Sequence, residues 1–306
     1  DVYKRQVHDR FMLYAMLGRT FFKVGEFDEH QLTLICEGVG GCGKSTIMKL
    51  MQLFWPQHVI GVLSSNIEPR FGMSQVLKKG RARLICSNEV SGDMQLVQEE
   101  WQTSCSGEVG SYAVKQEAPL VCKCEAQHLW VGNGFPECWK NDMGQVSRRL
   151  AGVHMMRKVQ PRDGRIFKVI EQHVASFQRC TVLAYFEFNN QYGSLDPMST
   201  PDKLPPAFRE YYFRGTRLSN PVVAFVSSNE HVVYDEKGFI EFKELKDLFT
   251  AYCVSNNVNP KKRNLTREHP FFIDNGLTVQ KSAEPQMLDG VPLPLNTWVV
   301  LGLRER

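Results

Sequence analysis

The stretch of sequence that decides the fold is Gly38-Val39-Gly40-Gly41-Cys42-Gly43-Lys44-Ser45-Thr46. It matches the pattern G-x-x-x-x-G-K-[ST], in which glycines let backbone N–H groups surround phosphate oxygens without interference from a Cβ atom. In this pattern the side chain of Lys44 reaches the β- and γ-phosphates of a nucleotide, and the hydroxyl of Ser45 binds Mg²⁺. The candidate nucleotide-binding residues are Gly38, Gly40, Gly41, Cys42, Gly43, Lys44, Ser45 and Thr46.

The residues on either side of this loop fit the structure that the pattern requires. Gln31 to Cys36 reads as a buried strand, and Ile47 to Trp55 reads as a helix that stops at Pro56. The amino terminus of such a helix carries a partial positive charge, which favours bound phosphate. Strand, glycine loop and helix in this order predict an α/β fold with a parallel sheet and a site for ATP and Mg²⁺.

An acidic residue ends the next apolar run, Arg83-Leu84-Ile85-Cys86-Ser87-Asn88-Glu89. A carboxylate at this place in an ATPase orients and deprotonates the attacking water, and it takes part in metal binding through ordered waters. Glu89 is therefore the candidate catalytic acid and a candidate metal ligand, and the alternative is a solvated carboxylate at a strand end. Asn88 stands where many P-loop ATPases have a second carboxylate, which weakens the case for direct metal coordination by this strand.

Two further segments carry polar residues that are candidates for catalysis. Residues 127–133 form an apolar run that ends in Asn133, whose amide would hold the attacking water or contact the γ-phosphate; an ordinary turn residue is the alternative. Residues 141–150 read as a short helix that carries Arg148 and Arg149. An arginine there can neutralise γ-phosphate charge across a subunit boundary, although two arginines on a solvated helix face are the alternative.

A hairpin is predicted between the acidic strand and the Asn133 strand. Apolar and polar residues alternate on both sides of Lys115 in residues 106–119, and Lys123 follows on the next stretch. Lys115, and second to it Lys123, are candidate contacts to nucleic-acid phosphates, and exposed lysines without that role are the alternative.

Taken together, the order of these motifs resembles that of superfamily 3 helicases, an AAA+ ATPase family of DNA viruses, phages and plasmids. The resemblance is strongest to poxvirus and giant-virus primase–helicases and to phage and plasmid primases, and it covers roughly residues 10 to 190. Besides the P-loop, it rests on residues 13–17 with Gly18-Arg19, on Asp28-x-x-Gln31, on residues 131–136 and on residues 142–150.

The resemblance implies a role for each candidate residue. Lys44 and Ser45 would bind nucleotide and Mg²⁺, Glu89 would be the catalytic acid, Asn133 the sensor, and Arg148 or Arg149 an arginine finger acting in trans. It also implies a homo-hexameric ring that moves 3′ to 5′ on single-stranded DNA and unwinds forked DNA. The hairpin would project into the central channel, and an upstream primase domain would precede this chain. The competing hypotheses are an ATP-gated DNA-loading or structural ring, and an RNA helicase of a small virus.

The sequence divides into four segments. Residues 1–6 resemble a translated sequencing adapter, 7–195 form the expected AAA+ domain, 196–229 a linker with a connecting helix, and 230–306 a small winged-helix-like α+β module. Within the first large segment, residues 165–188 look helical. In the last one we expect an amphipathic helix over 242–252, a basic stretch at 261–263 with Arg267, a short helix over 268–275 and a hairpin over 278–303.

The composition sets the class of protein. The 306 residues are 42% hydrophobic with a net charge of +4, which is too small by itself to indicate nucleic-acid binding. No apolar run long enough for a membrane span and no signal peptide is visible. The nine cysteines lie mostly in apolar segments, as reduced thiols of an intracellular protein do, and Cys122 and Cys124 lack the second pair that a zinc site needs. We therefore expect a location in the host cytoplasm or at a viral replication site.

Overall fold

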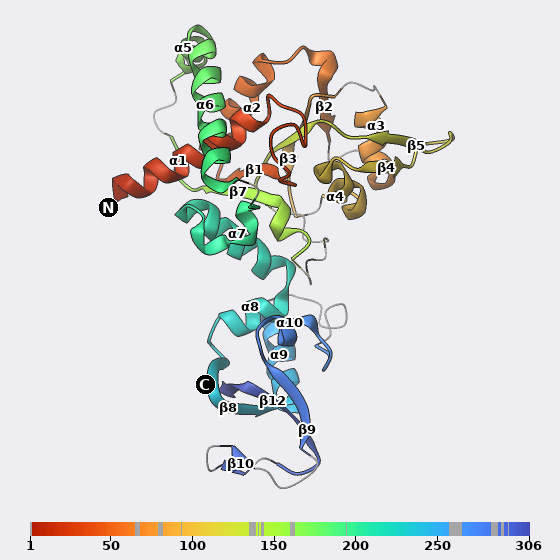
Figure 1. The fold of residues 1–306 in the computed structure, drawn as a ribbon, viewed down its shortest axis with the longest axis vertical. Coiled ribbons are helices and arrows are strands. Elements are labelled where there is room, and N and C mark those ends of the chain that lie inside the picture. The colour runs from red at the N-terminus through yellow and green to blue at the C-terminus, as the bar shows by residue number, and fades with distance from the viewer. Residues whose placement is uncertain are drawn as a thin grey trace. The chain divides into compact units, whose positions relative to one another are not determined.

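The computed structural model describes residues 2–64, 68–78, 82–92, 94–134, 139, 141, 144–159, 163–193, 195–256, 265–282, 287–288, 291–292 and 294–306. The chain forms two compact units (Figure 1). Unit 1 comprises residues 1–139 and 145–215, and unit 2 comprises residues 140–144 and 216–306.

Unit 1 is built on a five-stranded parallel sheet, as the P-loop pattern predicts. Its strands are β1 (Thr33–Gly38), β2 (Ile60–Leu63), β3 (Leu84–Val90), β6 (Gln127–Gly132) and β7 (Leu150–Met155), in the spatial order β2-β3-β6-β1-β7. Each neighbouring pair is parallel, so all five strands end at one edge of the sheet, the carboxyl edge, and begin at the other, the amino edge. The strand predicted over residues 31–36 is confirmed, with its bounds shifted to Thr33–Gly38.

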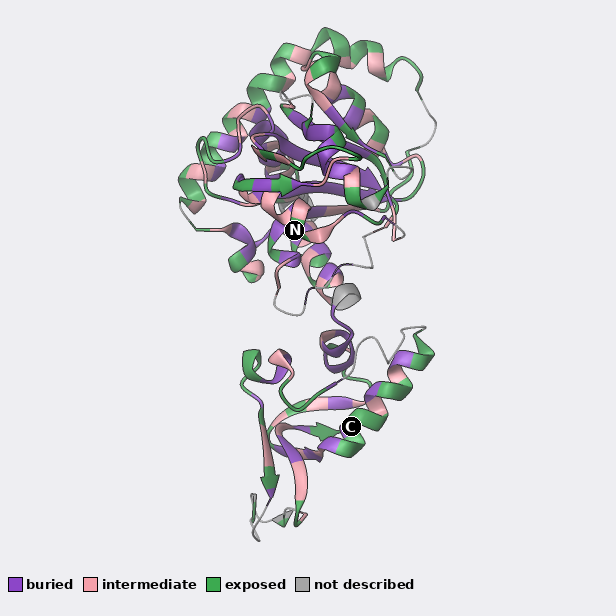
Figure 2. Ribbon diagram, turned by 90° about the vertical axis from the view of Figure 1, so that its right-hand side faces the viewer, coloured by how far each residue is buried: buried purple, intermediate pink, exposed green. Residues whose placement is uncertain are grey.

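Helices cover both faces of this sheet, so the strands are buried beneath more exposed helices (Figure 2). One face packs against α1 (Val2–Arg19), α2 (Lys44–Leu53) and α6 (Val174–Tyr192), and the other packs against α3 (Gly72–Leu77) and α4 (Gln98–Ser106). Because side chains alternate along a strand, Leu34 and Cys36 join the first core while Ile35 joins the second. Among the described helices, none combines the length and apolar composition that a membrane crossing requires.

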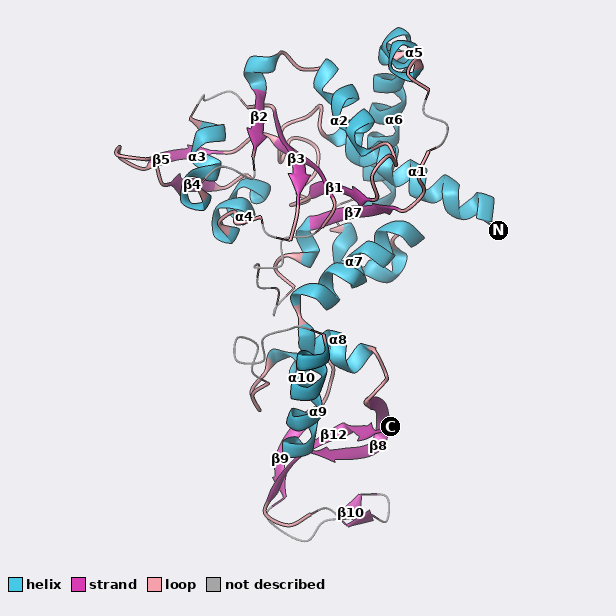
Figure 3. Cartoon of the chain, turned by 180° about the vertical axis from the view of Figure 1, so that it is seen from behind, coloured by secondary structure: helices cyan, strands magenta, loops and turns pink. Residues whose placement is uncertain are grey.

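Several connecting elements complete unit 1 (Figure 3). The predicted hairpin is present, with β4 (Val109–Tyr112) antiparallel to β5 (Leu120–Lys123). The helix expected over 165–188 is two helices, α5 (Ile166–Gln172) and α6, which meet at His173. The short 3-10 helices are η1 (Gln57–Val59), η2 (Pro69–Phe71), η3 (Ser147–Arg149), η4 (Pro197–Ser199) and η5 (Pro201–Lys203).

The helix predicted over residues 141–150 is wrong. In the described part of that segment the only helical element is η3, and the chain enters β7 directly afterwards at Leu150. The physical reason lies in Leu150 and Ala151, whose side chains are buried in the two cores of the sheet. Burial in a central parallel sheet outweighs the modest helix propensity of the preceding residues.

A buried polar cluster ties the start of the chain to the sheet. The Arg19 guanidinium donates to both carboxylate oxygens of Asp28, at 2.8 and 2.9 Å, and also to the side chain of Gln127 on β6. Tyr185 on α6 donates to the same carboxylate. Although burial alone would raise the pKa of Asp28, the charge of Arg19 and the hydrogen bonds from Arg19 and Tyr185 lower it overall. The Arg19 and Asp28 positions highlighted in the sequence therefore have a structural role.

The segment expected as a linker and connecting helix, 196–229, contains two helices. In α7 (Pro206–Ser219), Phe208 and Tyr211 pack into the two cores of unit 1. In α8 (Pro221–Ser227), Phe225 packs into the core of unit 2.

Unit 2 combines helices with a three-stranded antiparallel sheet of order β8-β12-β9. After α8 come β8 (Val232–Glu241), α9 (Phe242–Ser255), α10 (Pro270–Asp274), β9 (Thr278–Ser282), β10 (Met287–Leu288), β11 (Val291–Pro292) and β12 (Thr297–Glu305). The predicted amphipathic helix, short helix and hairpin are confirmed as α9, α10 and the β9–β12 pair. Strand β8 was not predicted, because Asp235-Glu236-Lys237-Gly238 interrupts its apolar alternation.

Candidate nucleotide-binding site

The glycine loop leaves β1 at the carboxyl edge and leads directly into α2. Gly38 approaches β7 so closely that a Cβ atom added to it would lie 2.1 Å from the carbonyl oxygen of Met155. Gly43 has a φ of 103°, a conformation that favours glycine, and it precedes the first residue of the helix. A side chain at Gly38 would thus push the loop off its strand, which explains why the pattern requires glycine there.

The amino terminus of α2 is open to a ligand. Its N-cap residue is Gly43, which has no side chain to accept hydrogen bonds from the first-turn N–H groups. Ser45 is exposed in this first turn and Thr46 is half-buried. A ten-residue helix with uncapped N–H groups next to a glycine loop suits a phosphate chain, and the exposed Ser45 hydroxyl suits a magnesium ion bound to that chain.

The side chain of Lys44 lies within its own loop. Its ammonium donates to the carbonyl oxygen of Gly38 at 2.5 Å and to that of Val39 at 2.9 Å, and it lies 3.6 Å from the sulfur of Cys42. These neutral oxygens hold the charge at the centre of the loop. A triphosphate is a stronger partner for an ammonium group than two carbonyls, so we expect nucleotide binding to exchange these contacts for phosphate oxygens.

Glu89 and Asn133 lie on neighbouring strands at the same carboxyl edge. Both side chains are exposed, and the backbone N–H of Asn133 donates to the carbonyl of Val90 at 3.0 Å, so these two strand ends are joined. In the register of the sheet, Glu37 of β1 pairs with Gly132, which places Asn133 level with the start of the glycine loop. The fold therefore brings the carboxylate of one strand end, the amide of the next and the glycine loop to one edge.

A buried ion pair that sequence reasoning missed adjoins the loop. Glu37, one residue before Gly38, is buried, and its carboxylate lies 2.7 Å from the guanidinium of Arg214 on α7 and 3.8 Å from the imidazole of His154 on β7. Tyr211, one turn earlier on α7, fills the space beside Gly152, where a Cβ atom would lie 1.9 Å from its ring. Burial and the neighbouring Glu37 carboxylate raise the pKa of Tyr211. These contacts hold α7 against the strand that carries the loop.

The two adjacent arginines differ in their surroundings. Arg149 is buried and donates to the carbonyl of Gln145 at 2.8 Å and to the hydroxyl of Ser106 at 3.5 Å, and burial lowers its pKa. Arg148 is exposed and forms no ion pair with the described residues. Both precede β7 at the amino edge, and the six residues of β7 separate them from the glycine loop by roughly 20 Å at about 3.3 Å per residue.

The hairpin presents its loop to solvent. Residues 115–119 are exposed, and the ammonium of Lys115 lies 3.5 Å from the carboxylate of Glu68 in a solvent-exposed pair. Lys123 is exposed at the far end of β5. An exposed ion pair contributes little to stability, so the ammonium of Lys115 can leave Glu68 and bind another anion.

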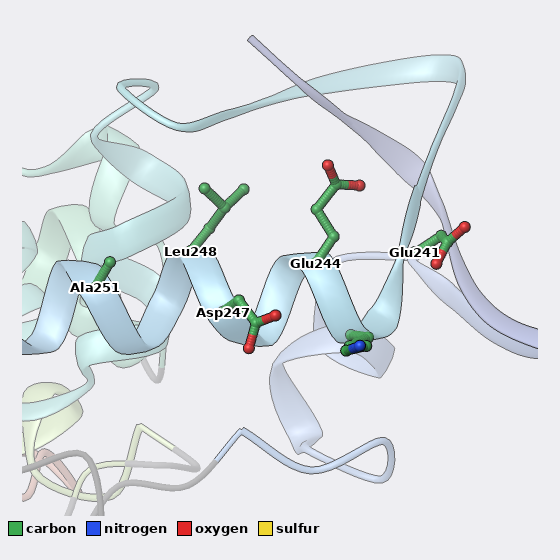
Figure 4. Close-up of a pocket in the computed structure, with 6 residues that line it drawn as sticks. Glu241, Glu244, Asp247, Leu248 and Ala251 are labelled. Atoms are coloured by element: carbon green, nitrogen blue, oxygen red, sulfur yellow. The ribbon is translucent and has the colours of Figure 1, made fainter.

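Unit 2 presents an acidic surface and a stacked arginine. A hollow beside α9 is lined by Glu241, Lys243, Glu244, Asp247, Leu248 and Ala251, with the carboxylates along the first turns of the helix (Figure 4). Burial, together with a hydrogen bond to Glu305 and nearby carboxylates, raises the pKa of Glu244. The guanidinium of Arg267 lies over the ring of Trp298 at 4.4 Å. The predicted basic stretch 261–263, like residues 135–136 and Asp142, lies outside the described residues.

Comparisons with known proteins give similarities to solved structures. No family model and no curated protein matches the chain. A structure of the NrS-1 C-terminal region in its A form is 14% identical, with a TM-score of 0.43, and covers 95% of this chain and 70% of that chain. A second NrS-1 structure, of residues 305–718, is 10% identical with a TM-score of 0.42 and the same shares. A structure of JCV helicase with a bound phenoxyphenyl acetamide is 11% identical, with a TM-score of 0.31, and covers 72% of this chain and 64% of that chain.

Proposed function

We propose that this chain is an ATP-hydrolysing motor that moves along single-stranded DNA, a helicase of the superfamily 3 type. The observation that carries the proposal is the carboxyl edge of the sheet in unit 1. There the glycine loop with Lys44, the carboxylate of Glu89 and the amide of Asn133 occupy adjacent or nearly adjacent strands. A loop that cradles phosphates, a carboxylate and a polar amide are the three parts that hydrolysis of a γ-phosphate requires.

In the proposed mechanism, the uncapped N–H groups of α2 and the glycine loop bind the phosphates of ATP. Lys44 leaves the carbonyls of Gly38 and Val39 and pairs with the β- and γ-phosphates. A magnesium ion held by the Ser45 hydroxyl, and by Glu89 through water, would neutralise phosphate charge when bound. Glu89 accepts the proton of the attacking water, and the amide of Asn133 keeps that water in line with the γ-phosphate.

We assign the arginine finger to Arg148 rather than Arg149. Arg149 is committed to Gln145 and Ser106 inside unit 1, whereas Arg148 is exposed. The separation of Arg148 from the loop of its own chain supports action on a neighbouring chain, as in a closed ring. A homo-hexamer, movement in the 3′ to 5′ direction and an upstream primase domain are further parts of this proposal, and they rest on the family resemblance alone.

For the DNA contact, Lys115 on the exposed hairpin loop is the first candidate and Lys123 the second. One weak cation from every subunit would give a ring a band of positive charge around its channel, despite the small net charge of the chain. Action inside an infected or plasmid-bearing cell, in the cytoplasm or at a replication site, follows from this function.

An unwinding assay tests the proposal, with a forked DNA that has a free 3′ tail and with ATP and Mg²⁺ present. We expect strand separation by the wild type and none by Lys44→Ala. A second candidate is a loading ring that hydrolyses ATP without unwinding, which the replacement of an acidic residue by Asn88 favours. DNA-stimulated hydrolysis without strand separation would select that candidate. A folded, hexameric protein that shows neither activity would refute both.

A further inference from the structure

A cavity of about 370 Å³ lies at the amino edge of the sheet, away from the glycine loop. Its lining comes from four chain segments that meet there, and the residues are Thr20, Phe21, Phe22, Lys23, Glu26, Trp55, Arg83 and Glu125. Arg83 directly precedes β3, and Glu125 comes just before β6, which places the cavity where these strands begin. Ligand sites commonly enclose roughly 300–1,000 Å³, so this one has room for one small ring-bearing ligand.

The wall of the cavity is aromatic, and its rings are held by neighbours. Phe21 contacts Phe54 edge-on, with 4.9 Å between ring centroids, and lies 6.2 Å from Trp55. Phe22 stacks on the buried Tyr185 at 5.5 Å. Rings fixed in this way offer a preformed apolar surface, and the flat face of a nucleobase is a partner that such a surface binds well.

The lining of the cavity holds two cations and two carboxylates, and Lys123, whose charge helps to lower the pKa of Glu125, adds a third cation nearby. Lys23 pairs with Glu125 at 2.8 Å, and the pKa of Glu125 is lowered by that hydrogen bond and by the charges of Lys23, Arg83 and Lys123. One carboxylate is thus shared by three cations. The other acidic residue, Glu26, accepts a hydrogen bond from the backbone N–H of Lys23 at 2.9 Å. Arg83 and Lys123 are exposed and form no salt bridge with the described residues, so both are available to a phosphate.

We infer that this cavity binds one nucleotide of a single-stranded DNA, with the base against Phe21, Phe22 and Trp55 and its phosphate beside Arg83 and Lys123. An aromatic surface next to cations is the combination by which proteins bind single strands without sequence preference. The inference rests on the proposed function, because it adds a second contact for the strand that the motor would move. The glycine loop lies at the opposite edge, so ATP and this nucleotide do not compete.

Anisotropy of a fluorescein-labelled oligothymidine measures the affinity of the full chain. We expect Arg83→Glu to weaken binding at least tenfold and Lys123→Glu at least threefold. In a plot of the logarithm of affinity against the logarithm of salt concentration, the slope for Arg83→Glu should be smaller in magnitude by about one. Lys168→Glu reverses an exposed charge on α5 and is the matched control, expected to stay within twofold of the wild type. Hydrolysis of ATP without DNA should be unchanged in Arg83→Glu.

Photocrosslinking identifies the position of the base. An oligonucleotide that contains 5-iododeoxyuridine should crosslink to peptides that contain Phe21, Phe22 or Trp55. Crosslinks confined to the hairpin loop, with unchanged affinity in Arg83→Glu, would overturn the inference and leave the motor intact, whatever the effect of Lys123→Glu, because Lys123 is also a candidate contact of the hairpin. A wild type that binds no oligonucleotide would overturn the motor as well. Thymidine monophosphate is the comparison: competition by it without any crosslink from the oligonucleotide would assign the cavity to a free nucleotide and overturn the strand inference.

Discussion

Removing the arginine that faces Glu37 should destabilise unit 1 far more than removing an exposed arginine. The Glu37 side chain is 2% exposed and its carboxylate lies 2.7 Å from Arg214, whose side chain is 33% exposed. In Arg214→Gln the carboxylate would lose its guanidinium partner, and the imidazole of His154, at 3.8 Å, would remain beside it. A buried carboxylate that has lost its partner is costly because no water replaces the missing charge.

The magnitude follows from these exposures. Breaking a fully buried pair costs about 3–5 kcal/mol of unfolding free energy, and the partial exposure of Arg214 brings the expected loss down to about 2–3 kcal/mol. Glu37→Gln combined with Arg214→Gln removes the unpaired charge and should restore stability to within about 1 kcal/mol of the wild type. The control is Arg165→Gln, which removes an arginine paired with Asp163 at 3.1 Å with side chains 86% and 49% exposed, and should leave the unfolding free energy close to that of the wild type.

Urea unfolding followed by tryptophan fluorescence measures these differences. Four of the five tryptophans lie in the ranges that form unit 1, so the signal reports mainly on that unit. The reasoning is refuted if Arg214→Gln is as stable as Arg165→Gln, or if the double variant is no more stable than Arg214→Gln alone.

Three further predictions concern other residues. Burial, with a smaller contribution from the charge of Arg19, lowers the pKa of His128 to about 3, so its contribution to stability is complete above pH 6.5 and is lost as pH falls, at about 1.4 kcal/mol per unit. Between pH 6.5 and 4.5, the free energy of unfolding measured in urea should therefore fall by about 2–3 kcal/mol more for the wild type than for His128→Gln. Equal changes in the free energy of unfolding of the two proteins over this pH range would contradict the prediction. Gly38→Ala should abolish binding of a fluorescent ATP analogue, because its Cβ atom would meet the Met155 carbonyl at 2.1 Å, whereas Gly164→Ala, in open space, should bind normally. In steady-state assays Arg148→Ala should lower the rate of ATP hydrolysis by roughly 10³-fold or more while leaving the melting temperature unchanged, and Arg149→Ala should lower the melting temperature; the reverse result would exchange their roles.

The glycine loop and its flanks could be predicted from the sequence because their requirements are local. The glycines of residues 38–43, the apolar strand before them and the helix after them are consecutive, so backbone conformation and hydrophobic pattern indicate the same element. The end of the Asn133 strand was predicted for the same reason. The parallel sheet followed from the strand–loop–helix order.

The remaining features depend on contacts between distant parts of the chain. Nothing in the residues around Glu37 indicates that Arg214 will pair with it, since the pairing exists only after α7 packs on the sheet. The pattern of residues 141–150 favours a helix, and burial of Leu150 in the sheet overrides it. Strand β8 is set by its pairing with β12, although its own sequence contains a charged turn-like run.

The separation of Arg148 from the glycine loop of its own chain has a genetic consequence for the proposed ring. A chain with a defective Lys44 would lose its own site, whereas a chain with a defective Arg148 would disable the site of its neighbour and keep its own loop intact. In a mixed ring of these two variants, some junctions would combine an intact Lys44 from one chain with an intact Arg148 from the next. Other junctions would combine a defective Lys44 with a defective Arg148. Either allele would be partly dominant over the wild type, and the two together would partly complement each other, a relationship that a self-contained site could not produce.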